Sequence, residues 1–416
     1  MATTLTTVSA ILKEDYQPGI REELNNKFRF LRQWEANTED VVGLEAYLAI
    51  HTSRNSGVGF RAEYGTLPTA GNQGYSAEKV KLRYGYGRMA ISGPIIKAMA
   101  TDRGSFDRAM RSETTRLVKD VMRTTNRAAW GTSDGVIADT EANAAATTVN
   151  LDVDTTAVQF RQLEPGMLVD IGPKGSNPAG SASQIQILAT GGSAGAFTIQ
   201  FCLPGGSSAI AVTTSDEDSI TQSGSGGGAS GGPAQKEPTG VQTIVAASGT
   251  LFNVDPTVTA VWKSTVSTNS GTKRSISESL IAQQIHAVDI ASGEEVRQLW
   301  GSDGVYRSVA NLLTPIKRFT NTQLLKGGYE ALEFAAGGVT CSLAWERDAP
   351  SNSLWGFTPE KLIEFYSSDW EFMDNDGAVL SRVPNVDAYE ATLEKYLELA
   401  TDARNAHFLL GDITEN

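Results

Sequence analysis

Histidine and cysteine are scarce in this sequence, which has 3 His and 2 Cys among 416 residues. None of the histidines, His51, His286 and His407, has the H-E-x-x-H spacing of a zinc enzyme. Cys202 and Cys341 stand far apart rather than in a C-x-x-C pair. The sequence also lacks a G-x-S-x-G elbow and a glycine-rich loop followed by Lys and Ser or Thr. We therefore expect a protein that is not an enzyme, with neither a cofactor nor a metal.

One acidic segment has some features of a calcium-binding loop. Residues 374–377, with the sequence DNDG, are similar to the first positions of such a loop. The later positions, Val379 and Ser381, carry no carboxylate, and Asn385 stands where the closing Glu belongs. A hairpin turn is the better interpretation of Asp-Gly at this point.

Long apolar runs are absent as well. No stretch approaches the ~18 residues that a membrane-spanning helix needs, so no membrane partner is expected. The N-terminus, MATTLTTVSAILKEDYQ, has neither the basic region nor the uninterrupted apolar region of a secretory signal. The two distant cysteines fit a reducing compartment, and a disulfide between them is the alternative interpretation.

Charge is unevenly distributed. Residues 1–130 contain 19 basic and 14 acidic side chains, a balance of +5, whereas the remainder contains 16 basic and 34 acidic ones, a balance of −18. Unevenness between domains is the simpler interpretation. The other is that the N-terminal half faces an acidic surface or polymer. The basic residues form no dense cluster, so sequence-specific binding of nucleic acid is poorly supported.

The strongest pattern present is an alternation of apolar residues on both sides of the turn-rich segment 66–76. It involves Val58, Phe60, Ala62 and Tyr64 before the turn, and Val80, Leu82, Tyr84 and Tyr86 after it. This period of two predicts a long hairpin of two strands, each with one apolar face. Because an isolated hairpin is marginally stable, its apolar face needs a cover, and we expect another copy of the chain to supply it.

Helical periodicity follows the hairpin. Apolar residues at helical spacing predict a long amphipathic helix over 105–130, with Ser105 as its N-cap. Helical spacing also occurs from Ile20 to Leu31, at the end of an N-terminal arm. A later helix is expected to open at Ser275, three residues before Glu278 as in a capping box, and to end near Gly293.

The composition changes near residue 132. Residues 135–235 contain two basic residues, neither Trp nor Tyr, and much Gly, Ala, Ser and Thr. Short apolar runs separated by turn signals predict a small all-β module, a barrel or a sandwich. The predicted strands are 147–153, 156–160, 166–172, 183–189, 196–202 and 208–213. The run SGSGGGASGGP at 223–233 is typical of a flexible linker.

In this order, the parts resemble the major capsid protein of a tailed bacteriophage, whose fold is shared with encapsulins. Residues 252–264 (FNVDPTVTAVWKS) and 369–410 (DWEFMDNDGAVLSRVPNVDAYEATLEKYLELATDARNAHFLL) also resemble capsid proteins of actinobacterial phages. The resemblance implies an α+β capsid fold with an inserted small all-β domain. Its parts would be an N-terminal arm (1–45), an extended hairpin or E-loop (46–98), a peripheral domain with the spine helix (99–134), the β insert (135–240), a mainly axial domain (241–368), and a return to the peripheral domain with the C-terminal segment (369–416).

The function implied by this resemblance is structural. Many copies would assemble as hexamers and pentamers into an icosahedral shell around double-stranded DNA, with scaffolding, portal and decoration proteins as further partners. The protein would form the capsid of a virion assembled in the host cytoplasm, and its DNA contacts would be non-specific. Contacts between copies are expected at seven hairpin residues: Phe60, Tyr64, Tyr75, Lys79, Lys81, Arg83 and Tyr84.

Two alternatives stay open at this stage. The first is an encapsulin-like shell that holds cargo enzymes instead of a genome. The second is a soluble hydrolase or carbohydrate-binding protein built on the β module. Some members of the family cross-link a hairpin Lys to an Asn of a neighbouring copy, which would involve Lys79 or Lys81 and Asn375 or Asn385 here, but ordinary surface roles are favoured.

Overall fold

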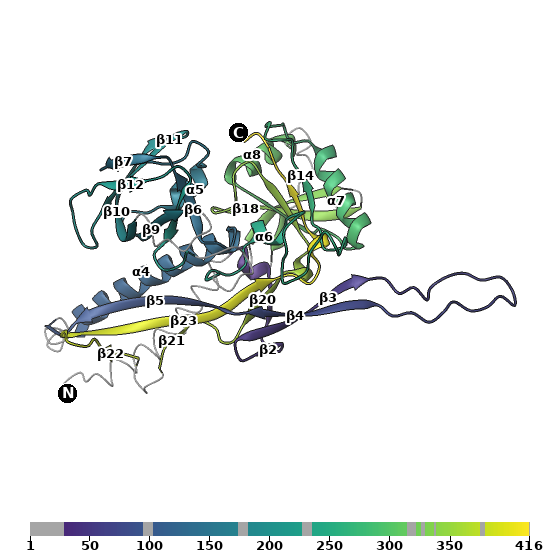
Figure 1. Ribbon diagram of the computed structural model, residues 1–416, viewed down its shortest axis with the longest axis horizontal. Coiled ribbons are helices and arrows are strands. Elements are labelled where there is room, and N and C mark those ends of the chain that lie inside the picture. The colour runs from purple at the N-terminus through teal and green to yellow at the C-terminus, as the bar shows by residue number, and fades with distance from the viewer. Residues whose placement is uncertain are drawn as a thin grey trace.

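The computed structural model describes most of the chain, in these ranges: 29–94, 103–173, 182–226, 235–313, 322–325, 329–336, 338–374 and 379–415. Most of the predicted arm, including Ile20, and the predicted turn at 375–378 lie outside the described residues. The molecule has a long, flat lower layer and two bodies above it, one built from the insert and one from the later part of the chain (Figure 1).

The lower layer is a six-stranded sheet around β23 (Ala388–Ala400). β5 (Arg83–Ser92) runs antiparallel to β23 along its whole length, with Ser92 opposite Ala388 and Arg83 opposite Leu397. Shorter strands pair on the other side of β23: β20 (Ile363–Tyr366), β21 (Glu371–Phe372) and β22 (Ser381–Arg382), with β1 (Glu35–Asn37) parallel to β20.

The predicted spine helix is confirmed as α4 (Arg103–Trp130). It begins two residues before Ser105, so the prediction of Ser105 as N-cap is wrong. Val118 and Val121 are buried where α4 crosses the sheet at β5. A Cβ atom on Gly87 would lie 2.7 Å from a methyl carbon of Val121, so the helix approaches the strand at a residue that has no side chain.

The hairpin is built from β3 (Glu45–Ser53) and β4 (Gly74–Lys81), with β2 (Val41–Val42) beside β3. Residues 54–73, which we call the tip, contain no strand. The prediction of a strand over 58–64 is therefore wrong. Its alternating side chains are exposed rather than packed against the described part of the chain, and Tyr64 adopts a left-handed backbone with φ of 61°. The strand forms earlier, where Ala46, Leu48 and Ile50 are buried.

The apolar face of the paired strands is covered by the same chain, which corrects the expectation that another copy covers it. Leu48, Ile50 and Val80 belong to one hydrophobic core with Leu251 and Phe252, from a segment that the sequence places far away. The side-chain amide of Asn253 also donates to the carboxylate of Glu78 in β4, over 3.2 Å. At the tip, by contrast, Phe60, Tyr64 and Leu67 are exposed.

The second body contains a seven-stranded sheet in the order β14-β24-β19-β15-β18-β17-β16. These strands are β14 (Thr265–Ser267), β24 (Phe408–Leu410), β19 (Leu354–Phe357), β15 (Gln298–Gly301), β18 (Val339–Trp345), β17 (Tyr329–Ala336) and β16 (Thr322–Leu325). The helices of this part are α6 (Val241–Ile244), α7 (Glu278–Ser292) and α8 (Asp303–Leu313). Three short 3₁₀ helices complete the described elements outside the insert: η2 (Leu31–Gln33), η4 (Pro359–Lys361) and η5 (Arg404–Ala406).

Helix α7 was placed correctly except at its start. Its N-cap is Ser277, whose hydroxyl accepts from the Leu280 amide over 3.3 Å, so the expected capping box beginning at Ser275 is wrong. The end at Gly293 is confirmed, because this residue has φ of 72° and closes the helix in the left-handed conformation.

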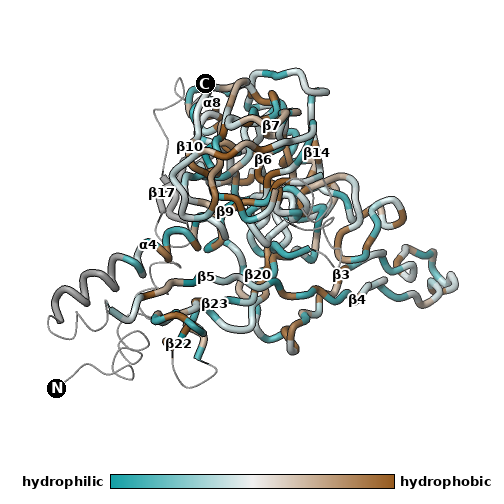
Figure 2. The backbone as a smooth tube through the Cα atoms, turned by 60° about the vertical axis from the view of Figure 1, so that its left-hand side comes forward, coloured by the Kyte–Doolittle hydropathy of each residue, from teal (hydrophilic) through white to brown (hydrophobic). Residues whose placement is uncertain are grey.

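The insert forms a mainly β module with one short helix, and its own hydrophobic core includes Val169, Ile187 and Phe201. Hydrophobic residues recur along its backbone around β6 and β9 (brown in Figure 2). Its larger sheet has the order β6-β13-β9-β10-β11-β8, and β7 pairs separately with β12. The elements are β6 (Val136–Thr140), β7 (Asn143–Ala146), β8 (Val149–Asn150), α5 (Ala157–Gln162), β9 (Leu168–Pro173), β10 (Ala182–Ser193), β11 (Ala196–Cys202), β12 (Val212–Thr214) and β13 (Asp218–Gln222).

Three of the strands predicted for the insert, at 166–172, 183–189 and 196–202, are confirmed as β9, β10 and β11. The strand predicted at 156–160 is wrong, because α5 occupies this position. Thr156 and Gln159 form a capping box, in which the Thr156 hydroxyl accepts from the Gln159 amide over 3.2 Å. The predictions at 147–153 and 208–213 are only partly right, since the strands there are the short β8 and β12.

Candidate assembly interface

The tip of the hairpin carries large apolar side chains that contact almost nothing. Phe60 and Tyr64 are 104% and 101% exposed, and Leu67 is 82% exposed. The hairpin projects away from the other described parts of the molecule (Figure 1). Clustered apolar exposure of this kind indicates an interaction site rather than an ordinary loop.

Internal hydrogen bonds give the tip a defined shape. The Arg61 guanidinium donates to the carbonyl of Thr66 over 3.1 Å and to that of Phe60 over 3.0 Å. The two sides of the tip meet at Gly57 and Gly71, where a Cβ on Gly57 would lie 2.9 Å from the Gly71 nitrogen. The apolar residues are therefore held on a closed loop.

We call β3, β4 and residues 82–86 the root of the hairpin. Its outer surface is polar and aromatic. Lys79 lies 3.5 Å from the Glu45 carboxylate and 5.3 Å from the centre of the Tyr47 ring. The pKa of Lys79 is raised above its usual value, mainly by Tyr47 and then by Glu45. Tyr75 is 67% exposed on the same hairpin.

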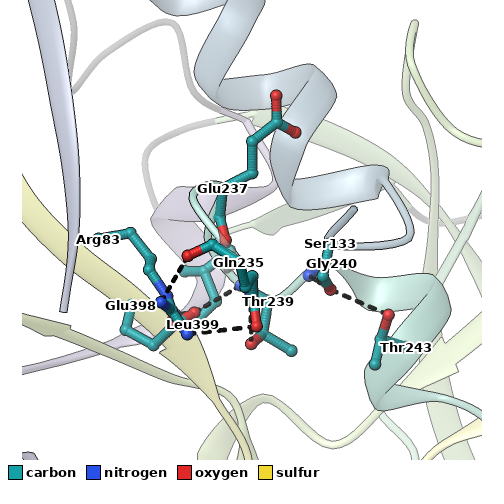
Figure 3. A network of polar contacts seen from close by, with 9 residues as sticks. All are labelled: Arg83, Ser133, Gln235, Glu237, Thr239, Gly240, Thr243, Glu398 and Leu399. Carbon is teal, nitrogen blue, oxygen red and sulfur yellow. Dashed lines mark hydrogen bonds and ion pairs between the residues drawn. The ribbon is translucent and has the colours of Figure 1, made fainter. Parts of the chain in front are cut away.

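Arg83 lies inside the molecule, where it joins the root to β23 and to the chain leaving the insert (Figure 3). Its guanidinium donates to Glu398 over 3.1 Å and to the carbonyl of Gln235 over 2.6 Å. The Glu398 carboxylate is 1% exposed, and it also accepts from the backbone amides of Thr239 and Leu399. Burial raises the pKa of Glu398, and the ion pair with Arg83 opposes that shift.

The same network reaches the end of the spine helix (Figure 3). The Gly240 amide donates to the Ser133 hydroxyl over 2.9 Å, and that hydroxyl donates to Thr243 over 2.9 Å. Close by, Arg127 of α4 forms a buried ion pair with Glu237. The hairpin root, α4, β23 and the return from the insert are thus joined by buried polar contacts, which hold the root rigid relative to the body.

A groove of about 820 Å³ runs beside this network. One wall is the root, with Lys81, Tyr84 and Tyr86. The second wall is α4, and the third consists of the two segments that connect the insert to the rest of the chain, 222–225 and 235–238. Tyr84 is 49% exposed and its ring packs edge-on against Tyr396 at 5.1 Å. The groove is therefore open to solvent and built partly by the insert.

The seven predicted contact residues thus divide between two places. Phe60 and Tyr64 lie on the tip, whereas the other five lie on the root: Tyr75, Lys79, Lys81, Arg83 and Tyr84. Their role in contacts between copies stays a prediction. For Arg83 the structure provides another role, because its guanidinium is held in the buried network. Leu67 and Tyr86 were missed as contact candidates, although both are large apolar residues in the hairpin segment.

The histidines, the cysteines and the acidic residues are the side chains that most often bind metals. In the ranges that it describes, no group of three or more His, Cys, Asp or Glu could hold a metal ion. His407 is buried, and burial lowers its pKa to about 3. Cys202 and Cys341 are buried free thiols, and burial raises the pKa of Cys341 to about 12. Among the described residues, no helix has the length and apolar character needed to cross a membrane.

No family model and no curated protein matches the sequence. Solved structures do match. The capsid protein of cyanophage A-1(L) aligns with a TM-score of 0.53 and 11% identity, over 93% of each chain. The capsid of an empty GTA particle aligns with a TM-score of 0.48 and 8% identity, over 94% of this chain and 90% of that chain. A virus-like particle from Pyrococcus furiosus aligns with a TM-score of 0.42 and 8% identity, over 96% and 98%. The match to the cyanophage capsid shows that this chain has the phage capsid fold.

Proposed function

We propose that this protein is the major capsid protein of a tailed phage, whose copies assemble as hexamers and pentamers into an icosahedral shell. The observation that carries the proposal is the tip, which exposes Phe60, Tyr64 and Leu67 at the end of a rigidly anchored hairpin. A projecting apolar loop without an intramolecular partner suits an obligate assembly of identical subunits, in which each copy supplies the surface that another lacks.

The shell would enclose double-stranded DNA through non-specific contacts. The balance of +5 in residues 1–130 supports this, and Arg116 and Lys119 are exposed on α4. Contacts of this kind are electrostatic, so DNA binding is expected to weaken steeply as salt is added. The affiliation with actinobacterial phages, the boundaries of the domains and the scaffolding, portal and decoration partners stay predictions.

Assembly of the purified full chain tests the proposal. Size-exclusion chromatography and negative-stain electron microscopy are expected to reveal capsomers or closed shells containing nucleic acid. A discrete monomer or dimer under all assembly conditions would contradict the proposal and favour a soluble protein. Shells that contain protein cargo and no nucleic acid would favour the nanocompartment instead.

A variant without the tip tests the part that we assign to the hairpin. Because Gly57 and Gly71 already lie side by side, residues 58–70 can be deleted and these two glycines joined. The variant is expected to fold, since the buried face of β3 and β4 is untouched, and to lose shell formation. Val258→Ser, which removes an apolar side chain that is 84% exposed elsewhere, is the matched control and should assemble normally. Normal shells from the deletion variant would refute the role of the tip.

A further inference from the structure

The insert has a hydrophobic core that is separate from those of its neighbours. In the ranges that the structure describes, none of the members of this core, such as Val169 and Phe201, belongs to either of the other two cores. The attachment at the connecting segments is polar and buried, since the ion pair of Arg127 with Glu237 leaves 6% and 8% of the two side chains exposed. An insert that shares no apolar core with its neighbours can change its orientation with little loss of apolar burial. Its orientation therefore depends on its polar contacts.

A second set of polar contacts is made by the segment that directly follows α5. The Glu164 carboxylate accepts from two guanidinium groups, that of Arg123 in α4 and, over 3.2 Å, that of Arg347 in the second body. All three side chains are partly open to solvent, with exposed fractions between 35% and 49%. One carboxylate of the insert thus joins the spine helix to the second body.

Neighbouring hydrogen bonds complete this junction. The Arg161 guanidinium of the insert donates to the backbone carbonyl of Arg347 over 2.7 Å. The Asp348 carboxylate of the second body accepts from Gln162 of the insert over 3.5 Å and from Asn126 of α4 over 2.6 Å. α5 lies on the side of the insert that faces the second body (Figure 1). The insert, the second body and α4 therefore meet at one place, where each contacts the other two.

A cavity of about 780 Å³ lies beside the junction. Its lining includes Arg88 of β5, Gln184 of the insert, and the three ionic partners Arg123, Glu164 and Arg347. The space between the insert and α4 is therefore not filled by side chains. The ion pairs of Glu164 border an open space rather than a packed interface, so the insert has room to move once they separate.

The two attachments of the insert differ in how easily they open. A buried ion pair is costly to separate, because each charge is left without its partner inside the protein. Partly exposed pairs are individually weak and are screened by salt. The attachment through Arg127 and Glu237 is of the first kind, and the contacts of Glu164 are of the second kind.

We propose that Glu164, with Arg123 and Arg347, forms a releasable clasp through which the insert holds the second body in a fixed orientation to the spine helix. The buried attachment keeps the insert on the subunit, and the clasp sets its orientation. The consequence for assembly rests on the proposed function. A closed shell of uniform size needs subunits that agree in shape, because the rotation between copies decides whether and where the assembly closes.

Distances between spin labels in unassembled subunits test the clasp. Val153→Cys in the insert and Ile290→Cys on α7 place the labels at positions that are 62% and 86% exposed, whereas Cys202 and Cys341 are buried. With the clasp intact, one narrow distance distribution is expected. Glu164→Ala removes both ion pairs, so we expect the population outside this distance to rise about fivefold.

Glu360→Ala is the matched control. It removes an exposed ion pair with Arg297 that does not involve the insert, and the distribution should stay narrow. Raising the salt from about 0.15 M to about 1 M shortens the screening length from about 8 Å to about 3 Å. This should broaden the distribution of the intact clasp and leave that of Glu164→Ala nearly unchanged. An equally narrow distribution for Glu164→Ala would overturn the inference, and so would equal broadening in the control.

Particle size provides a second readout. Shells of Glu164→Ala are expected to vary in diameter under negative-stain electron microscopy, whereas those of Glu360→Ala should match the wild-type shells. Uniform shells of Glu164→Ala would overturn the role of the clasp in assembly. Failure of the wild-type chain to assemble would instead refute the proposed function, because the distance measurement uses unassembled subunits. Circular dichroism checks that both variants are folded.

Discussion

The root and the tip belong to the same hairpin and carry similar alternating patterns, yet their apolar side chains differ in burial. At the root, Leu48 and Ile50 are buried in the core of their own chain. At the tip, Phe60 and Tyr64 are fully exposed. The difference teaches that the alternation of apolar residues indicates a face that needs a packing partner. It does not indicate which segment or which copy provides that partner. In one case it is the distant segment around Leu251, and in the other we propose that it is a second copy.

The largest effect on the stability of the subunit is expected at the buried ion pair of the root. Arg83→Met leaves the Glu398 carboxylate buried without its counterion, which should lower the free energy of unfolding by about 3–5 kcal/mol. Chemical denaturation of unassembled subunits measures it. Arg88→Met is the matched control, because the ion pair of Arg88 with Glu390 is largely exposed and should contribute less than about 1 kcal/mol. Equal losses would mean that the root network does not anchor the hairpin.

A pair of leucine variants compares the two regions directly. Leu48→Ala opens a cavity in the core and should cost about 2–5 kcal/mol of unfolding free energy. Leu67→Ala removes a side chain that is 82% exposed and should change it by less than about 0.5 kcal/mol. The same denaturation measurement is used for both. A large loss for Leu67→Ala would show that the tip packs within its own chain, against the proposal.

A rise in pH is expected to lower the stability of the body and to leave the tip unaffected. Glu346 is 8% exposed where α4 meets the second body, and it accepts from the Arg347 amide over 2.8 Å and from the side chain of Asn126 over 3.2 Å. Burial raises the pKa of Glu346 to about 7, with nearby Asp348 adding to the shift.

Because this folded-state pKa exceeds the unfolded value, Glu346 stabilises the fold below about pH 4.5, and the stabilisation is lost as the pH rises to about 7. The expected loss is on the order of 3 kcal/mol. Glu346→Gln should remove this component from the pH profile of unfolding. An unchanged profile would contradict the assignment.

The smallest effect on folding, and the clearest separation of the two regions, is expected for Phe60→Ser. The free energy of unfolding should change by less than about 0.5 kcal/mol, since the side chain is fully exposed. Shell formation, scored by electron microscopy, should nevertheless be impaired. Normal assembly of this variant would remove Phe60 from the predicted contacts.

Much of the fold could be predicted from local patterns, and the errors have local causes too. The spine helix could be predicted because its apolar period is regular, and β9, β10 and β11 because short apolar runs are separated there by turn signals. The strand predicted at 156–160 failed because the capping box of Thr156 and Gln159 favours a helix. The strand predicted at 58–64 failed because alternation without a surface to pack on does not hold a strand.

The candidate interface was predicted only in part. Exposed aromatic residues of the hairpin were identifiable by their residue type and position, and Phe60, Tyr64 and Tyr84 are indeed exposed. The role of Arg83 could not be identified from the sequence. Its partners Gln235 and Glu398 lie far along the chain, and no pattern near Arg83 indicates them. The groove could not be predicted either, since its three walls come from the root, α4 and the insert.

The sequence by itself determined the order of parts, the long helix, the mainly β character of the insert and the existence of a hairpin. These depend on periodicity, turns and composition, which act over a few residues. The tertiary structure alone decided that β5 pairs with β23, that the root is covered from within, and that the tip is not. Those outcomes depend on contacts between segments hundreds of residues apart, which no local pattern specifies.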